Sequence, residues 1–202
     1  MQIRVATIVE SPKSPEAFLH QQTVTITGDG AVEIGNNVKA NVDLNLPRVG
    51  LSLQLPGGFE QFKWYGRGPV ENYQDRKAGT AVGFYSSTVD EQYVPYIMPQ
   101  ENGNKTDVRW LSLTNEAGVG LKVTADSALM EASVSHYSAD DLFKATHTNE
   151  VTRQEAVILN LDHAQAGLGG ASCGPATLEQ YRLRPGDYKF SFRLQPVVPT
   201  GE

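Results

Sequence analysis

The clearest pattern in the chain is Val38-Lys39-Ala40-Asn41-Val42-Asp43-Leu44-Asn45-Leu46, in which hydrophobic and polar side chains alternate until Pro47. Successive side chains of a β-strand point to opposite faces of a sheet, so this alternation is typical of a strand with one buried face. A sheet that is buried on one face and exposed on the other is commonly antiparallel. The stretch therefore predicts an antiparallel β-strand over residues 38–46.

The same alternation recurs along the chain. Thr23–Thr27 and Ala31–Ile34 flank Gly28-Asp29-Gly30, which predicts a β-hairpin with a glycine-bearing turn. Further alternating stretches cover residues 49–55, 111–114, 119–123, 157–161 and 188–194. The fold class is therefore predicted to be all-β, an antiparallel β-sandwich.

The one helical signal lies at Ser138-Ala139-Asp140-Asp141, where a serine N-cap precedes two acidic residues. It predicts one or two turns of helix ending near Ala145. No repeat, low-complexity segment or linker-like run divides the sequence, so residues 1–202 are expected to form a single β-sandwich domain.

Composition excludes several classes of partner. The chain has 202 residues, 40% of them hydrophobic and 20% charged, and its net charge is −6 without a Lys/Arg cluster. A phosphate backbone requires a basic stripe, so no nucleic-acid partner is expected, and an anionic membrane surface is disfavoured for the same reason. No hydrophobic run is long enough to span a membrane, and no targeting segment is recognisable, which leaves the compartment unknown.

Metal and cofactor sites are not expected either. The four histidines show no ligand spacing, and one cysteine, Cys173, cannot complete a zinc site. Cys173 is more often a packed, inert thiol than a nucleophile. The glycines at Gly167-Leu168-Gly169-Gly170 lack the spacing of a dinucleotide-binding loop and instead predict a tight loop between two strands.

The densest segment is Trp64-Tyr65-Gly66-Arg67-Gly68-Pro69-Val70-Glu71-Asn72-Tyr73-Gln74-Asp75-Arg76. Its glycines allow close approach of backbone segments, and Pro69 fixes one φ angle. Glycosidases use two carboxylates, about 5–9.5 Å apart depending on stereochemistry. Glu71 and Asp75 would lie about 13 Å apart in an extended segment, and about 6 Å apart only in a helical turn. Structural hydrogen bonds are the favoured role for both, and acid–base chemistry is the alternative.

A second polar segment, Pro99–Thr106, follows Tyr96 and contains Glu101 and Asn102. Its carboxylate and amide groups could bind sugar hydroxyls while Tyr96 stacks on the sugar ring. The alternative, which is favoured, is a fixed loop whose side chains bond to its own backbone.

Residues 64–76 resemble the signature Trp-x-Gly-x-Gly-Pro-x-Glu-Asn-Tyr-x-Asp-Arg of the C-terminal domain of large bacterial β-galactosidases. Residues 93–103 and 160–170 are similar to the next two blocks of that domain, and the agreement runs from about Val24 to Leu194. The signature residues are Trp64, Gly66, Arg67, Gly68, Pro69, Glu71, Asn72, Tyr73, Asp75 and Arg76. The resemblance implies a galactose mutarotase-like β-supersandwich within a multi-domain glycoside hydrolase that cleaves terminal non-reducing β-galactosyl residues.

The resemblance also implies which part of the parent enzyme carries the catalytic residues. The family's catalytic glutamates lie in a preceding (β/α)8 barrel, which this sequence lacks, so no residue here is expected to be catalytic. The chain is expected to supply pocket rim and architecture, without a cofactor. The substrate-binding candidates are Ser172, Cys173, Gly174, Glu101 and Asn102.

The family's opening segment has no counterpart here. The sandwich is therefore expected to be incomplete on its N-terminal side, and the chain is expected to be a C-terminal fragment of a longer protein. Its partners would be the remaining domains and a galactoside at the rim, in a parent that is a homo-oligomer.

Two other functions remain open. One is a mutarotase-like sugar epimerase, for which His163 with Glu101 is the only acid–base pair worth testing. The other is a stand-alone carbohydrate-binding module with Tyr65, Tyr73 and Tyr96 as stacking platforms. The parent is expected to be an enzyme, and whether the isolated chain is one stays open.

Overall fold

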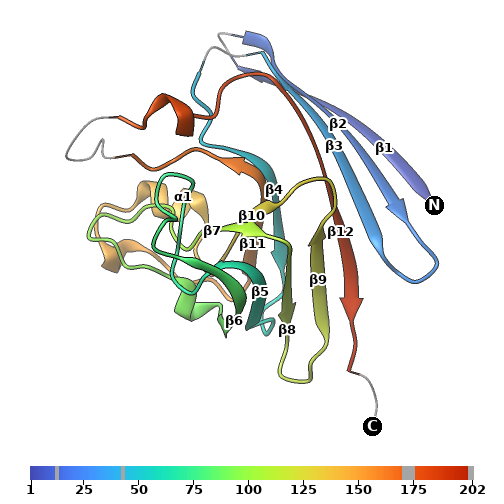
Figure 1. Ribbon diagram of the computed structural model, residues 1–202, viewed down its shortest axis with the longest axis vertical. Coiled ribbons are helices and arrows are strands. Elements are labelled where there is room, and N and C mark those ends of the chain that lie inside the picture. Colours follow the sequence, from blue (N-terminus) through green and yellow to red (C-terminus); the bar gives the residue numbers. More distant parts are fainter. Residues whose placement is uncertain (12–13, 42–43, 170–175, 200–202) are drawn as a thin grey trace.

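Two antiparallel sheets make up the computed structural model, which describes residues 1–11, 14–41, 44–169 and 176–199 (Figure 1). The larger sheet has eight strands in the order β1-β2-β3-β12-β9-β8-β5-β6. Their bounds are β1 (Gln2–Ser11), β2 (Ser14–Ile26), β3 (Val32–Ala40), β12 (Asp187–Val197), β9 (Gly120–Ala125), β8 (Trp110–Thr114), β5 (Gln61–Gly68) and β6 (Ala81–Thr88). The smaller sheet has four strands in the order β4-β11-β10-β7. Their bounds are β4 (Arg48–Leu55), β11 (Val157–Gln165), β10 (Met130–Ser135) and β7 (Lys105–Val108).

The hydrophobic core lies between the two sheets. Trp64 and Leu111 face each other across β5 and β8, and both are almost completely buried. Leu159 and Leu161 of β11 contribute the opposing layer from the smaller sheet. Because side chains alternate along each strand, burying these residues leaves the other face of β4, β11 and β10 pointing away from the core.

Most of the strands predicted from alternation are present. The hairpin is confirmed, with Ile26 of β2 opposite Val32 of β3, and residues 188–194 lie within β12. The strand predicted over residues 38–46 is wrong in its second half, because β3 ends at Ala40. The neighbouring strand β12 begins at Asp187, opposite Lys39, so β3 loses its partner on that side, while the Asn41 amide still donates to the Ala17 carbonyl of β2 at 2.9 Å.

Helical structure is confined to short segments in the described residues. The predicted turn is helix α1 (Ala139–Lys144), capped by the Ser138 hydroxyl, which accepts a hydrogen bond from the Asp141 amide. Three 3₁₀ turns complete the set: η1 (Asp90–Gln92), η2 (Thr148–Glu150) and η3 (Glu179–Tyr181). No helix among the described residues has the length and hydrophobicity needed to cross a membrane.

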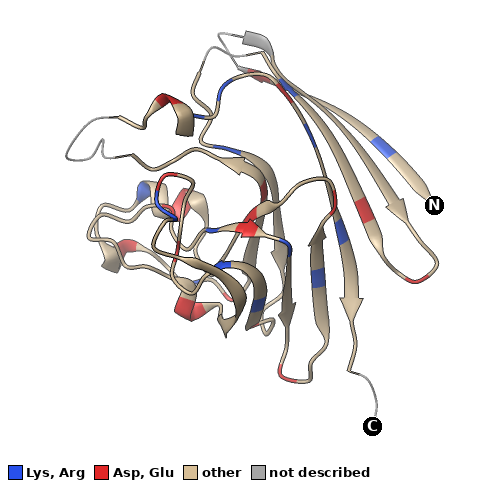
Figure 2. Ribbon diagram, viewed as in Figure 1, with Lys and Arg blue, Asp and Glu red and all other residues tan. Residues whose placement is uncertain are grey.

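The larger sheet extends well beyond the smaller one. In Figure 1, β1, β2 and β3 fan out to one side, where the smaller sheet does not cover them. In the described residues β1 pairs with β2 alone, so it forms one edge of the larger sheet and the sheet is not closed. Positive and negative side chains are interspersed over both sheets and the loops (Figure 2).

Candidate functional site

The signature segment leaves β5 and packs against the core. The Trp64 indole N–H donates to the Arg67 carbonyl at 3.0 Å, and its ring stacks on Phe62 at 4.7 Å. A Cβ on Gly66 would lie 2.9 Å from the Val108 side chain, so glycine is needed for this close approach. The signature therefore begins as a packed corner of the sandwich.

Glu71 connects the signature to the second motif block. Its carboxylate accepts hydrogen bonds from the hydroxyls of Tyr73 and Tyr96, from Arg76, and from the Gly103 amide at 2.8 Å. Burial opposes ionisation of this carboxyl, but the hydrogen bonds from Tyr96 and Gly103 and the charge of Arg76 outweigh it, so the pKa of Glu71 is lowered. Glu71 thus binds residues 96–103 to the signature loop.

Asn72 makes a second, fully buried connection. Its side-chain oxygen accepts from the amide and the hydroxyl of Thr106, at 2.8 and 2.6 Å. Asn104 donates to the Asn72 carbonyl at 3.1 Å and to Glu131 on β10 at 2.8 Å. Burial raises the pKa of Glu131, although Gln74 also donates to it. These side chains fix the loop to the smaller sheet.

Asp75 joins the third motif block to the first. Its two carboxylate oxygens accept from the backbone amides of Leu168 and Gly169, at 3.1 and 2.7 Å. A Cβ on Gly167 would lie 2.6–2.9 Å from the same carboxyl group. The glycines of this segment therefore admit a side chain from the signature, and the three blocks meet at one end of the sandwich.

A charged cluster borders this junction. Arg48 pairs with the buried carboxylate of Asp162 and with Glu101, whose Oε1 lies 2.5 Å from the arginine Nη1. Gln165 also donates to Glu101, at 2.9 Å. Burial raises the pKa of Asp162 to about 6, although the hydrogen bond and charge of Arg48 act in the opposite direction. Arg48 is the cation that the two acids share.

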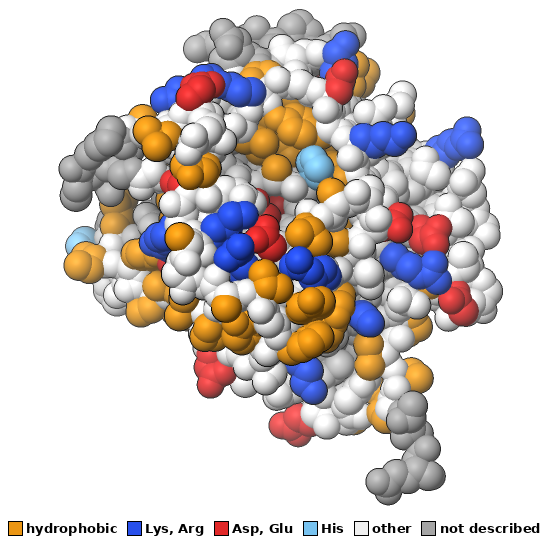
Figure 3. All heavy atoms as spheres, viewed as in Figure 1, with side chains coloured by type: hydrophobic (Ala, Val, Ile, Leu, Met, Phe, Trp, Pro, Cys, Tyr) orange, Lys and Arg blue, Asp and Glu red, His pale blue; other side chains and the backbone are white. Residues whose placement is uncertain are grey.

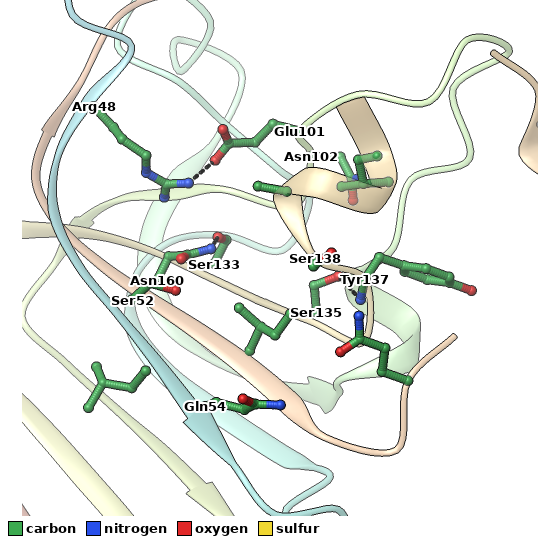
Figure 4. A pocket seen from close by; sticks show the side chains of 15 residues that line it. Arg48, Ser52, Gln54, Glu101, Asn102, Ser133, Ser135, Tyr137, Ser138 and Asn160 are labelled. Atoms are coloured by element: carbon green, nitrogen blue, oxygen red, sulfur yellow. Dashed lines mark hydrogen bonds and ion pairs between the residues drawn. The ribbon is translucent and has the colours of Figure 1, made fainter. Parts of the chain in front are cut away.

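A polar groove opens beside this cluster, on the outer face of the smaller sheet. Its volume is about 380 Å³. Figure 4 shows Arg48 and Glu101 meeting at one end, Ser52, Ser133 and Asn160 lying together, and Gln54 at the other end. The segments with Asn102 and Ser138 lie opposite the strands and form the second wall.

The structure places only part of the predicted substrate-binding set. Glu101 and Asn102 both line the groove, whereas Ser172, Cys173 and Gly174 lie outside the described residues. The Asn102 amide is bonded to its own loop, accepting from the Val94 amide and donating to the Gln100 carbonyl. Glu101 therefore offers a charged group to the groove, and Asn102 mainly shapes the loop.

The residues proposed for the two other functions are not brought together. The His163 ring stacks on Phe190 of β12 at 5.2 Å, and Glu101 bonds to Arg48 and Gln165 instead. Burial lowers the pKa of His163. The structure thus gives the pair no shared substrate site.

Of the three predicted stacking platforms, Tyr73 is wrong, because it is completely buried. The Tyr96 hydroxyl is held by Glu71 and Arg76, and the role of its ring as a platform stays a prediction. Tyr65 is half-buried and stacks on Phe84 at 4.4 Å. Figure 3 shows hydrophobic side chains gathered on this face of the molecule, with Lys and Arg beside them. These tyrosines pack against other side chains because the signature segment uses its aromatic rings to fix the loop.

Three residues of the site escape sequence reasoning: Arg48, Glu131 and Gln165. Arg48 directly follows Pro47 at the start of an alternating strand, and an arginine at the end of a strand is usually interpreted as solvent-exposed. Glu131 lies in β10, whose residues Met130–Val134 are all buried and so show no alternation.

Among the described residues, no group of three His, Cys, Asp or Glu side chains is placed to hold a metal ion.

Comparison with known proteins identifies a matching family and several relatives. A family model described as the β-galactosidase small chain matches residues 2–194. The β-galactosidase of Kluyveromyces lactis is 40% identical over 151 residues, which are 74% of this chain and 14% of the relative. That of Vibrio cholerae is 38% identical over 205 residues, which are 96% of this chain and 19% of the relative.

Two further matches complete the comparison. The β-galactosidase of Priestia megaterium is 33% identical over 178 residues, 87% of this chain and 17% of the relative. Among solved structures, a GalM/aldose epimerase homologue from C. elegans covers 98% of this chain at 13% identity with a TM-score of 0.49. The chain thus spans 14–19% of the length of these curated relatives. It belongs to the β-galactosidase small-chain family.

Proposed function

We propose that this chain is the part of a β-galactosidase that completes the rim of the active site, while the acid and the nucleophile come from another part of the enzyme. The parent would hydrolyse terminal non-reducing β-galactosyl residues. The proposal rests on one observation, the match of residues 2–194 to a small segment of much longer β-galactosidases.

The acids near the junction are already bound in hydrogen bonds and ion pairs, which supports a catalytic acid and nucleophile that come from elsewhere in the enzyme. Glu71 and Asp75 accept hydrogen bonds that hold loops, and Asp162 and Glu101 share the charge of Arg48. A retaining glycosidase needs two carboxyls about 5–5.5 Å apart and facing one glycosidic bond. Acids already bonded to backbone amides and arginine are poorly suited to take and give protons.

In this proposal Glu101 and residues 172–174 contact the galactoside, and the partners of the chain are the remaining domains of a homo-oligomeric parent. Glu101 is the better supported of the two contacts, because its side chain lines the groove and is about a third exposed. The contact by Ser172, Cys173 and Gly174 stays a prediction from the resemblance.

A segment exchange tests the proposal. The segment of the Priestia megaterium enzyme that matches this chain is either deleted or replaced by residues 1–202, and hydrolysis of o-nitrophenyl β-galactoside is measured. We expect the deletion to abolish activity, the replacement to restore it, and the isolated chain to show none. Turnover by the isolated chain that disappears in Glu101→Gln would overturn the proposal.

A variant of the exchanged enzyme tests the role of Glu101. Glu101→Gln keeps the shape but weakens a hydrogen bond to a substrate hydroxyl, so we expect KM to rise about ten-fold while kcat changes little. Glu116→Gln, at an exposed turn, is the matched control and should leave both constants unchanged. A fall in kcat by several orders of magnitude would instead mark Glu101 as catalytic.

A further inference from the structure

The floor of the groove consists of two rows of side chains that cross three strands. Ser52 of β4 lies opposite Asn160 of β11, which lies opposite Ser133 of β10. The next row along the strands contains Gln54, Ile158 and Ser135 in the same order. Strand spacing makes this floor about 10 Å wide, and successive rows lie about 7 Å apart. Its dimensions therefore suit a ligand of two linked rings.

The groove offers no unpaired charge. Among the described residues that line it, Arg48 is the one cation and Glu101 the one carboxylate; they form an ion pair at one end, and Arg48 also pairs with Asp162. The chain as a whole is 20% charged, so an ordinary exposed sheet face of this size would contain unpaired Lys, Glu or Asp. A phosphorylated or carboxylated ligand would find no free cation here. The lining therefore favours a neutral ligand.

Several polar groups of the floor have unused hydrogen-bonding capacity. Among the described residues, neither the hydroxyl of Ser52 nor the side-chain amide of Gln54 forms a hydrogen bond. Asn160 donates to the Ser133 hydroxyl at 3.1 Å, which leaves its side-chain oxygen free to accept. Ser135 accepts from the Tyr137 amide at 2.9 Å, which leaves its hydroxyl proton free to donate. Donors and acceptors thus alternate over the floor, as the hydroxyls of a sugar require.

The groove also offers a small hydrophobic contact. Ile158 in the floor and Leu142 of α1 in the wall both line it, and α1 is held in place by its Ser138 cap. A pyranose ring has a hydrophobic face of C–H groups as well as hydroxyls, so it matches a lining that combines polar and hydrophobic groups. The volume of about 380 Å³ falls in the range of small-molecule sites.

We propose that this groove is a binding site for a neutral oligosaccharide, with two sugar residues lying across β4, β11 and β10. Asn160 and Gln54 bind hydroxyls with their side-chain amides, and Ser52 and Ser135 add hydroxyl contacts. Ser133, which is only 3% exposed, holds the Asn160 side chain in place. This inference deepens the proposed function, because Glu101, the rim contact proposed above, lines the same groove, and it differs in that the site is formed by the described residues of this chain alone.

The experiment is a titration of the full chain, residues 1–202, labelled with ¹⁵N and followed by NMR. Lactose and cellobiose are the neutral probes, and lactobionate is the charged one. We expect saturable shifts of the amides around Ser52, Asn160 and Ser135 with the neutral disaccharides, and much weaker binding of lactobionate. Hydrolytic activity plays no part in this readout, so failure of the rim proposal leaves it unaffected.

Three variants locate the binding. Ser52→Trp fills the floor and Asn160→Ala removes an amide, and each should weaken binding about ten-fold or more, as the loss of a hydrogen bond or of space predicts. Ser112→Trp, on the exposed face of β8 in the other sheet, is the matched control and should bind as the wild type does. Circular dichroism checks that each variant is folded.

Three results would overturn the inference. One is the absence of saturable shifts at tens of millimolar of both neutral sugars. Another is binding that persists unchanged in folded Ser52→Trp and Asn160→Ala. The third is shifts that map instead to the aromatic row of Tyr65, Phe84 and Trp110 on the larger sheet.

Discussion

Lys105 is the residue whose burial is least expected from its chemistry. Only 2% of it is exposed, and its ammonium group donates to the Gly103 carbonyl at 3.0 Å and lies 5.3 Å from the centre of the Trp64 ring. Burial lowers the pKa of this group to about 8 from 10.5, although the charge of Glu71 partly opposes the shift. The folded protein therefore holds a cation that would be better solvated in the unfolded chain.

We predict that Lys105→Met stabilises the protein at pH 7. The pKa shift corresponds to a penalty of at most about 3 kcal/mol, and loss of the hydrogen bond to Gly103 costs about 1 kcal/mol, so a gain of about 1–2 kcal/mol is expected. Between about pH 8 and pH 10.5 the unfolded chain binds more protons at this site than the folded chain does, so the wild type gains stability as pH rises. The advantage of the variant should therefore shrink toward pH 10.

Urea unfolding at pH 7, 8, 9 and 10 measures this difference. Lys63→Met, at an exposed position of the neighbouring strand β5, is the matched control and should change the free energy of unfolding by less than about 0.5 kcal/mol at every pH. A Lys105→Met variant that is destabilised equally at all four pH values would show that the ammonium contacts outweigh its burial.

The residue scale also shows where sequence reasoning stops. Glu71 and Asp75 stand out because their segment combines glycines, a proline and charges, and in the structure they join the signature to the other two motif blocks. Glu131 and Gln165 do not stand out, because a buried acid or amide is defined by partners distant in sequence. Gln74 and Asn104, which donate to Glu131, come from two other segments of the chain.

At the scale of elements, alternation identified strands with one exposed face and overlooked the rest. The sequences of β4, β9 and β12 alternate between hydrophobic and polar residues and so predict strands, whereas residues 130–134 of β10 are all buried and do not alternate. The end of β3 at Ala40 could not be predicted, because it lies next to the start of β12 opposite Lys39, and that partner is distant in sequence. Local pattern gives the type of an element, and its pairing partners set its length.

The loop after β11 supplies a prediction about a single glycine. A Cβ at Gly167 would lie 2.6–2.9 Å from the carboxyl group of Asp75, which binds the amides of Leu168 and Gly169. We expect Gly167→Ala to displace that carboxyl and to destabilise the protein by about 1–3 kcal/mol. Hydrogen exchange should quicken at the amides of Leu168 and Gly169.

Gly79→Ala is the matched control for this change. A Cβ at Gly79 would have no atom within 4 Å, so a change of less than about 0.5 kcal/mol, or a slight gain, is expected. If the two substitutions had the same effect on stability and exchange, Asp75 would not be the clamp of this loop.

At the scale of the whole molecule, the two sheets are unequally covered. The core lies under the smaller sheet, and the outer strands of the larger sheet extend past it to β1 (Figure 1). Residues 2–10 of β1 are all exposed. Val5 and Ile8 of β1 are 46% and 57% exposed. A long edge strand with exposed hydrophobic side chains and unpaired backbone groups is a template for pairing with another chain.

We therefore predict that the isolated chain self-associates through β1 as its concentration rises. Val5→Lys places a charge on that edge, and we expect it to weaken the association at least about ten-fold, a cost of about 1.4 kcal/mol, because like charges would meet across the paired edges. Val119→Lys, at a 40% exposed turn position, adds the same charge elsewhere and is the control. Sedimentation velocity over a hundred-fold concentration range separates the outcomes. A wild-type chain that stays monomeric throughout would show that β1 is protected despite its exposure, and equal weakening by both variants would trace the association to net charge instead of the edge.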